Sequence, residues 1–219
     1  GITSQEYKFD VINTPSIQTI SLNLKYPRYT KKQNETISNT GNLTVPQGTT
    51  VEWVVKTSET DTVSFIQQEK KTFFKKIQAD EFQYQKQVSK NLNYQISTSN
   101  QNLKDYEQLQ FSIDVVKDEY PTINVNSNID SISRGNAQFV GQIADDYGFK
   151  KLELVYYDKN NSQNIENQLI KINKEAIQTF YYEFPNGLNL KEGVDYELYF
   201  QVYDNDVVNG SKKTVSNKF

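Results

Sequence analysis

The sequence contains no cysteine, no histidine and no methionine, and only one tryptophan, Trp53. Without cysteine or histidine the chain has no thiolate nucleophile, no imidazole base and no soft metal ligand. These absences exclude zinc sites, Ser-His-Asp and Cys-His triads and most redox chemistry, so we expect no catalytic residues and no enzyme activity. The lack of cysteine does not fix the compartment, because many periplasmic proteins have no disulfide bonds.

Long apolar runs and an excess of positive charge are also missing. No run approaches the roughly 20 apolar residues that a membrane-spanning helix needs. We expect any secretion or anchoring signal to lie outside these 219 residues and the segment itself to be soluble. The 24 basic and 27 acidic residues give a net charge of -3 and a pI of about 5.2. This balance argues against a nucleic-acid partner or an anionic membrane surface, which require a concentrated positive field.

The sequence is instead rich in short stretches in which apolar and polar residues alternate, separated by turn-forming residues. Residues 50–57, for example, place Val51, Trp53 and Val55 on one face of a strand. No segment shows a sustained helical period. The pattern predicts an all-β fold.

Two halves of the chain resemble each other, which predicts a tandem repeat. Pro15 and Pro121 each stand between the closing strand of one repeat and the opening strand of the next, where proline ends a ladder and stiffens the junction. Their separation fits one sandwich domain. We therefore predict two tandem immunoglobulin-like β-sandwich domains, residues 15–118 and 119–219.

Seven strands fit each predicted domain. In the first they are residues 17–26, 50–57, 61–67, 72–78, 82–88, 93–99 and 109–116. In the second they are residues 122–127, 137–144, 150–157, 168–173, 177–184, 195–203 and 213–219. Residues 27–49 and 158–167 are expected to be long polar connections. Antibody-type domains match less well, because the inter-sheet cysteine pair is absent and Trp53 falls on the second strand instead of the third.

Residues 1–14 precede the first domain and have two interpretations. Phe9-Asp-Val-Ile-Asn-Thr-Pro15-Ser-Ile17 matches the later Ile113-Asp-Val-Val-Lys-Asp-Glu-Tyr-Pro121-Thr-Ile123, with a shorter linker. Residues 3–13 are then either the terminal strand of a preceding repeat or an extra edge strand of the first sandwich. In the first case they are available for strand exchange with another chain.

Two acidic turns are the densest clusters of oxygen ligands. Asp145 and Asp146 lie in one turn, and Asp204 and Asp206 lie in the other. If both turns meet at one end of the second sandwich, the four carboxylates are a candidate calcium site; the alternative is that they only cap turns. We expect no other cofactor. Such acids in polar turns are expected to be solvated, which keeps their pKa values ordinary and argues against glycoside hydrolysis.

Paired tyrosines are the other candidate site. Tyr156 and Tyr157, and likewise Tyr181 and Tyr182, must each point one ring inward and one outward, because side chains alternate along a strand. Outward rings on neighbouring strands form an amphipathic platform for a carbohydrate. The alternative is that the rings only pair across a sheet.

With these residues identified, the sequence resembles a family of large membrane proteins from Bacteroidetes that is catalogued as a domain of unknown function. The matching stretches are Tyr26-Pro-Arg-Tyr-Thr-Lys-Lys32, Asn39-Thr-Gly-Asn-Leu-Thr-Val-Pro46, Lys117-Asp-Glu-Tyr-Pro121, Asp145-Asp-Tyr-Gly148 and Tyr203-Asp-Asn-Asp206-Val-Val-Asn-Gly210. The resemblance implies upstream transmembrane helices followed by extracytoplasmic immunoglobulin-like repeats, in the periplasm or at the cell surface. It provides no site residues.

Two functional hypotheses follow. The first is a non-catalytic structural or protein-interaction module of a membrane-anchored extracytoplasmic protein, in which rigid sandwiches present loops to a partner. The alternative is a carbohydrate-binding or adhesive module that uses outward tyrosine rings and Asp/Asn loops. The partner is accordingly an unidentified protein or glycan.

Overall fold

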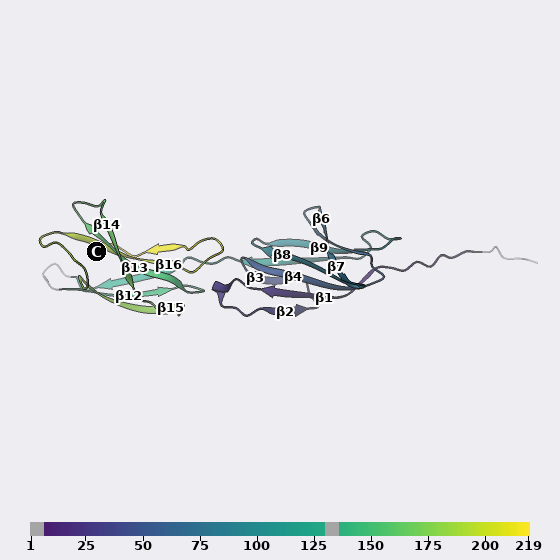
Figure 1. The fold of residues 1–219 in the computed structure, drawn as a ribbon, viewed down its shortest axis with the longest axis horizontal. Helices are drawn as coiled ribbons and strands as arrows, with labels where there is room; N and C mark the ends of the chain where they lie inside the picture. Colours follow the sequence, from purple (N-terminus) through teal and green to yellow (C-terminus); the bar gives the residue numbers. More distant parts are fainter. Residues whose placement is uncertain (1–6, 130–135) are drawn as a thin grey trace, which may run out of the picture. The chain divides into compact units, whose positions relative to one another are not determined.

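The computed structural model describes residues 7–129 and 136–219 of the chain (Figure 1). In the part before residue 117 the strands are β1 (Ser16–Lys25), β2 (Glu35–Ser38), β3 (Leu43–Pro46), β4 (Thr49–Ser58), β5 (Thr62–Gln67), β6 (Lys70–Phe73), β7 (Lys75–Gln78), β8 (Glu81–Val88), β9 (Leu92–Ser99) and β10 (Gln108–Val116), with a short 3-10 helix η1 (Arg28–Thr30). After it they are β11 (Thr122–Ser127), β12 (Ala137–Ala144), β13 (Phe149–Asp158), β14 (Ile165–Ile170), β15 (Ile177–Phe184), β16 (Tyr196–Asp204) and β17 (Lys213–Val215). None of the described helices is long and apolar enough to cross a membrane.

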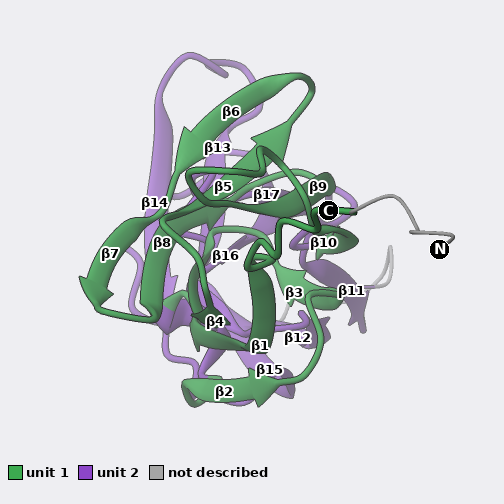
Figure 2. Cartoon of the chain, turned by 90° about the vertical axis from the view of Figure 1, so that its right-hand side faces the viewer, with its two compact units in different colours: residues 1–27, 32–116 green, residues 28–31, 117–219 purple. Residues whose placement is uncertain are grey.

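The chain divides into two compact units, shown in different colours in Figure 2. Unit 1 contains residues 1–27 and 32–116, and unit 2 contains residues 28–31 and 117–219. The short segment 28–31, which includes η1, is therefore part of unit 2 although the strands on both sides of it in sequence belong to unit 1.

Unit 1 is a sandwich of two five-stranded sheets. One sheet has the order β2-β1-β4-β8-β7 and the other the order β3-β10-β9-β5-β6. Strands β1, β4, β8 and β7 follow the A-B-E-D order of an immunoglobulin sheet, and β5, β9 and β10 follow the C-F-G order. The edge strand β3 pairs in parallel with β10, with Ile113 opposite Leu43. Unit 1 is thus an immunoglobulin-like sandwich.

Two features of unit 1 differ from the strands predicted from sequence. Residues 27–49, expected to be a connection, contain η1, β2 and β3. Residues 72–78, expected to be one strand, are divided at Phe74 into β6 and β7, which belong to different sheets. Phe74 is buried in the core at this crossing, which explains why the apolar pattern continues through the break.

The core of unit 1 is built around aromatic rings. Trp53 is fully buried and packs edge-on against Phe65 and Tyr94, with ring centroids 5.1 and 5.5 Å away. The indole N–H of Trp53 donates to the Tyr94 hydroxyl at 2.9 Å, and that hydroxyl donates to the Gly41 carbonyl at 2.7 Å. Burial raises the pKa of Tyr94 well above its usual range, so the hydroxyl keeps its proton. The single tryptophan is therefore both packed and hydrogen-bonded.

Unit 2 is a smaller sandwich of a three-stranded sheet, β11-β12-β15, and a four-stranded sheet, β14-β13-β16-β17. Its core is separate from that of unit 1 and includes Phe200, whose ring centroid lies 5.3 Å from that of Phe139 and 5.2 Å from that of Phe180. Gly141 leaves room for this packing, because a Cβ there would lie 2.2 Å from two ring atoms of Phe180. The prediction of two tandem all-β, immunoglobulin-like sandwiches is confirmed.

The described part of the N-terminal segment lies outside both sheets of unit 1, and its two interpretations stay predictions. Residues 7–15 form no strand, and residues 1–6 lie outside the described residues. Asn13 contacts unit 1 through its carbonyl, which accepts from the Asn100 side chain at 2.8 Å.

Candidate functional site

The densest polar cluster of unit 2 is centred on the ammonium group of Lys212. It contacts carboxylate oxygens of three aspartates: Asp118, Asp204 at 3.0 Å and Asp206 at 3.1 Å. The three aspartate side chains are 0% exposed and that of Lys212 is 14% exposed. We call these four residues the Lys212 cluster. A buried charge is stable in a protein only when it is paired and hydrogen-bonded, and the Lys212 ammonium meets that condition through the three carboxylates.

Local turns hold the carboxylates of this cluster in place. Asp204, the last residue of β16, accepts from the backbone N–H of Lys212 at 2.8 Å. Asp206 caps the next turn by accepting from the backbone N–H groups of Val208 and Asn209. Aspartate is favoured in such turns because its short side chain can accept from backbone groups two or three residues ahead.

The second acidic turn lies at the same end of unit 2. Phe149, which opens β13, is paired with Asp204, so the turn at residues 145–148 is next to the end of β16. Asp145 accepts from the backbone N–H of Gly148 at 2.7 Å, and the side chain of Asn205 donates to the Tyr147 carbonyl at 3.0 Å. The four acids predicted from sequence are therefore brought to one end of the sandwich.

Asp204 and Asp206 are buried, which corrects the expectation that these two acids are solvated, whereas Asp146 is exposed. Burial raises the pKa of Asp118 to about 7, and the nearby negative charges of Asp146 and Asp204 act in the same direction. For Lys212, burial opposes the charged form, but hydrogen bonds to Asp118 and the two other aspartates raise its pKa above the usual range. One ammonium cannot neutralise three buried carboxylates, so Asp118 is the acid that takes up a proton near neutral pH.

Segment 28–31 covers part of this end of unit 2. Tyr29 is buried, and its ring meets that of Tyr147 edge-on with centroids 5.3 Å apart. The Lys31 ammonium donates to the Lys174 carbonyl at 2.8 Å. Burial, followed by the charge of Asp118, raises the pKa of the Tyr29 hydroxyl, which excludes a phenolate there. These contacts account for the assignment of the segment to unit 2.

The predicted calcium ligands do not form a metal-binding group in the part of the chain that is described. No set of three or more His, Cys, Asp or Glu side chains there is arranged to hold a metal ion. Asp204 and Asp206 instead bind the Lys212 ammonium, and Asp145 binds backbone N–H groups. A cation does sit among these carboxylates, but it is a lysine side chain.

Sequence reasoning missed two members of the cluster, Asp118 and Lys212. Asp118 lies 94 positions from Lys212, so no local spacing connects them. The only local signal is the lysine that follows the acidic stretch of Asp204 and Asp206 within one turn-rich loop. From the sequence alone, such a lysine is predicted to be exposed to solvent.

The four tyrosines of the proposed platform are not brought together. Tyr156 and Tyr157 lie on β13, whereas Tyr181 and Tyr182 lie on β15 of the other sheet. Tyr156 and Tyr157 are both buried: Tyr156 packs in the core, and the Tyr157 hydroxyl donates to Glu197 and accepts from Lys218. Only Tyr181 is widely exposed, at 75%. The Tyr182 ring packs against the core, and its hydroxyl donates to Gln168.

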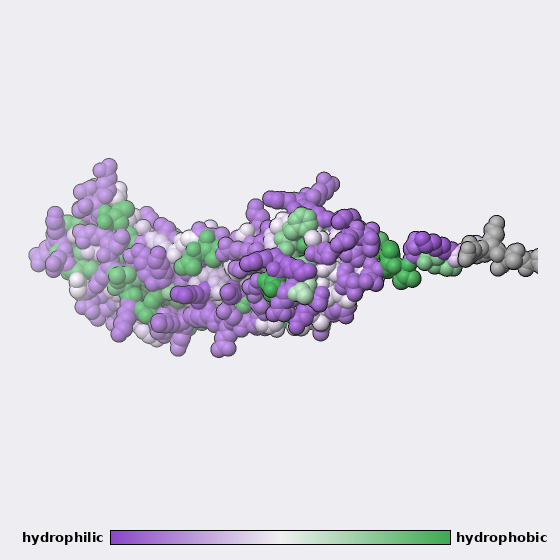
Figure 3. Space-filling model, turned by 45° about the vertical axis from the view of Figure 1, so that its right-hand side comes forward, coloured by the Kyte–Doolittle hydropathy of each residue, from purple (hydrophilic) through white to green (hydrophobic). Residues whose placement is uncertain are grey.

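The outer face of the four-stranded sheet in unit 2 carries exposed apolar side chains along edge strand β14. Leu169 and Ile165 on edge strand β14 are 69% and 53% exposed and point to the same side as the buried Tyr157. A pocket of about 360 Å³ on this face is lined by Tyr157, Ser162, Ile165, Tyr199, Val215, Ser216 and Lys218. We call this surface the β14 face. Contiguous exposed apolar side chains mark interaction surfaces more often than isolated ones do. Figure 3 shows hydrophobic patches among the hydrophilic residues that dominate the visible surface.

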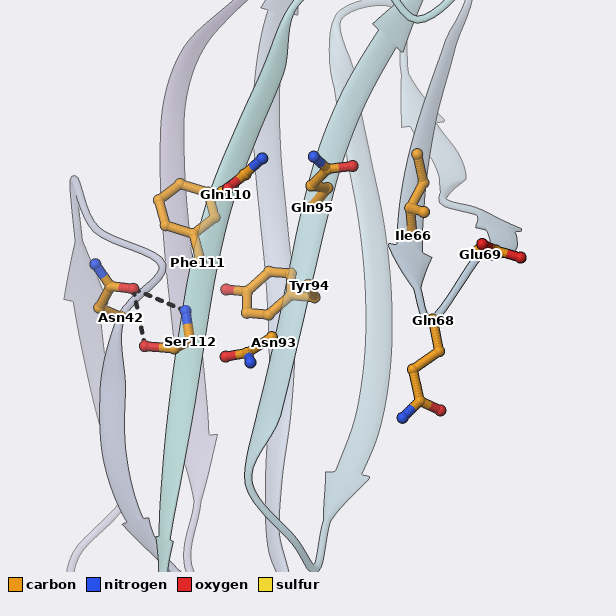
Figure 4. A pocket seen from close by; sticks show the side chains of 10 residues that line it. All are labelled: Asn42, Ile66, Gln68, Glu69, Asn93, Tyr94, Gln95, Gln110, Phe111 and Ser112. Carbon is orange, nitrogen blue, oxygen red and sulfur yellow. Dashed lines mark hydrogen bonds between the residues drawn. The ribbon is translucent and has the colours of Figure 1, made fainter.

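Unit 1 has a different, amide-lined pocket of about 610 Å³ on its second sheet. Gln110 on β10 is paired with Gln95 on β9, and Gln95 with Ile66 on β5, so these side chains form a row across three strands. Figure 4 shows Asn42 beside this row, with its side-chain oxygen accepting from the backbone N–H of Ser112 at 2.8 Å. The lining is mostly neutral and can both donate and accept hydrogen bonds.

Comparisons with known proteins concern the family and the fold. The sequence matches the profile of DUF4175, a domain of unknown function, over residues 16–180. No curated protein matches it. Among solved structures, fibronectin(III)-like modules of CbhA from Clostridium thermocellum are 16% identical with a TM-score of 0.28, and the match covers 82% of this chain and 88% of theirs. Domains A168-A170 from titin are 12% identical with a TM-score of 0.30, covering 91% of this chain and 65% of theirs.

Proposed function

We propose that this chain, which belongs to the DUF4175 family, is a non-catalytic module that binds another protein through the β14 face. Each unit is an immunoglobulin-like sandwich, a fold that commonly serves as a structural or interaction module. Such a fold provides a rigid frame on which exposed residues are held in a fixed arrangement.

The observation that carries this proposal is the exposure of Leu169 and Ile165. The solvent face of an antiparallel sheet is normally polar, because its outward positions face water. Here two of the three outward positions of β14 are occupied by isoleucine and leucine, with Asn167 between them, and Ile165 lines a pocket that contains Tyr157 and Tyr199. Covering two such side chains contributes about 1.5–3 kcal/mol each. The partner chemistry is therefore an apolar protein surface.

The proposal is tested with a photo-crosslinking amino acid placed at Leu169 in native cells. We expect a discrete crosslinked protein that disappears when Ile165 is replaced by serine. Gln142, an exposed residue on β12 in the other sheet, is the matched control position. Absence of any crosslink at Leu169, or the same products at both positions, would refute the proposal.

We also propose that the module is extracytoplasmic, in the periplasm or at the cell surface, and is tethered to a membrane by another part of its protein. The resemblance of five sequence stretches, described above, to a family of membrane proteins from Bacteroidetes supports this localisation. Protease treatment of intact cells and of spheroplasts tests it. Protection of this segment in both preparations would place it in the cytoplasm and contradict the proposal.

Glycan binding is a second candidate, supported by the amide-lined pocket of unit 1 and not by the four tyrosines. Neutral amide side chains such as Gln95 and Gln110 suit the hydroxyl groups of a sugar, which are also neutral donors and acceptors. A glycan array with the wild type and a Gln95→Ala/Gln110→Ala variant decides this. Binding that the variant loses supports the candidate, and no binding by the wild type removes it.

A further inference from the structure

Residues 7–13 carry three large apolar side chains that no part of the described structure covers. Tyr7, Phe9 and Val11 are 75%, 86% and 94% exposed. They occupy alternate positions, with the polar Lys8 and Asp10 between them. A period of two is the pattern of a strand with one buried face, so the sequence of this segment encodes a strand whose apolar face has no cover.

The same pattern occurs in β10, where the three corresponding apolar side chains pack in or against the core of unit 1. The match between the two segments aligns Tyr7 with Phe111 and Phe9 with Ile113. In β10, Ile113 is fully buried and Phe111 packs against the core of unit 1. The residues that face solvent in segment 7–13 are therefore those whose counterparts in β10 face a core.

The chain that follows the two segments is also alike. Pro15 is buried and β1 begins at the next residue, Ser16. Pro121 is likewise buried and β11 begins at the next residue, Thr122. Strand β10 is the last strand of its sandwich, and the proline after it precedes the first strand of the next one. Segment 7–13 has the corresponding place before unit 1.

We propose that residues 7–13 form the last strand of an immunoglobulin-like repeat that precedes unit 1 in the same protein. By analogy with β10, which pairs antiparallel with β9 and parallel with β3, this strand would close the open edge of a sheet in the preceding repeat. Tyr7, Phe9 and Val11 would point into the core of that repeat. The partner is therefore a sandwich with an exposed apolar interior along one edge.

Hydrogen exchange of the backbone amides tests this assignment. In the present chain we expect the amides of residues 8–13 to exchange without protection, whereas those of β10 are protected. In a chain extended upstream in its gene by about 100 residues, one further sandwich domain, we expect residues 8–13 to become protected at least 100-fold. A Phe9→Ser substitution in the extended chain should reduce this protection, and the matched Asp10→Ser substitution should not.

Three results would overturn the proposal. If the amides of residues 8–13 stay unprotected in the extended wild-type chain, these residues are not a strand of a preceding repeat. If the amides of residues 8–13 are protected in the present chain at every protein concentration, the segment belongs to unit 1. Protection that appears only at high protein concentration would show strand exchange between two copies of this chain instead.

Discussion

Replacement of Lys212 by methionine tests the central electrostatic feature of unit 2. Methionine keeps an unbranched side chain of similar length but removes the charge and the N–H donors of the ammonium group. Lys212 donates to three aspartates whose side chains are fully buried, so the substitution leaves several carboxylates without a counter-charge. Because the backbone hydrogen bonds of Asp204 and Asp206 remain, the change isolates the contribution of the ammonium.

The expected loss of stability is large. Removing one partner of a buried ion pair typically costs about 3–5 kcal/mol. Asp118, whose pKa is already raised to about 7, can relieve part of the repulsion by taking up a proton. We therefore expect the lower end, about 3 kcal/mol at pH 7, which corresponds to a decrease of roughly 12–24 °C in the Tm of a domain of this size. The penalty should shrink at pH 5, because Asp118 is then protonated and no longer needs a cation.

The two units can be followed separately. Trp53 is the only tryptophan and is buried in unit 1, so its fluorescence reports unit 1, whereas far-UV circular dichroism reports both units. We expect Lys212→Met to lower the Tm measured by circular dichroism by more than it lowers the Tm measured by Trp53 fluorescence. Lys213→Met, the exposed neighbour in β17, is the matched control and should change the Tm by less than about 3 °C. Equal effects of the two substitutions would refute the role of the Lys212 cluster.

Three further substitutions give expected outcomes. Gly141→Ala should destabilise unit 2 by about 1–3 kcal/mol in thermal unfolding, because the new Cβ would meet the Phe180 ring at 2.2 Å; unchanged unfolding would mean that the ring moves freely. Tyr94→Phe should cost about 1–3 kcal/mol in urea unfolding followed by Trp53 fluorescence, because two buried groups lose their partner; a neutral result would contradict that account. Burial raises the pKa of Asp118 to about 7 from an unfolded value near 3.9, so the folded state binds the proton more tightly than the unfolded state does. The free energy of unfolding of unit 2 should therefore fall by about 1–3 kcal/mol as the pH rises from 5 to 8. Asp118→Asn should flatten this dependence, and an unchanged pH profile would count against it.

The sandwich fold could be predicted from the sequence because most strands bury one face. Val51, Trp53 and Val55 alternate with polar residues and are all fully buried in unit 1. The prediction was wrong where that simple relation fails. Strand β3 is short and ends at Pro46, so residues 27–49 look like a polar loop. At Phe74 the apolar pattern continues through a change of sheet, and a period of two cannot show which sheet a residue joins.

The candidate sites were less predictable, because they depend on neighbours that are distant in sequence. The alternation rule places Tyr156 and Tyr157 on opposite faces of β13, and this holds. It does not reveal that Tyr157 is buried on the outer face as well and is hydrogen-bonded to Glu197. The apolar β14 face is visible in the sequence as Ile165 and Leu169, but their outward direction follows only from the pairing of β14 with β13.

The Lys212 cluster shows why the acidic turns suggested a cation site and yet bind a side chain. Carboxylates that the fold brings together and buries require a positive counter-charge, whichever group supplies it. The position of Asp204 at the end of β16 and of Asp145 before β13 suggested from local sequence that the acids meet at one end of the sandwich, but not that Asp204 is buried. The choice between a metal ion and an ammonium depends instead on whether a lysine side chain can reach the carboxylates. Lys212 does so because the backbone hydrogen bond from its own N–H to Asp204 fixes the start of that side chain beside the acids.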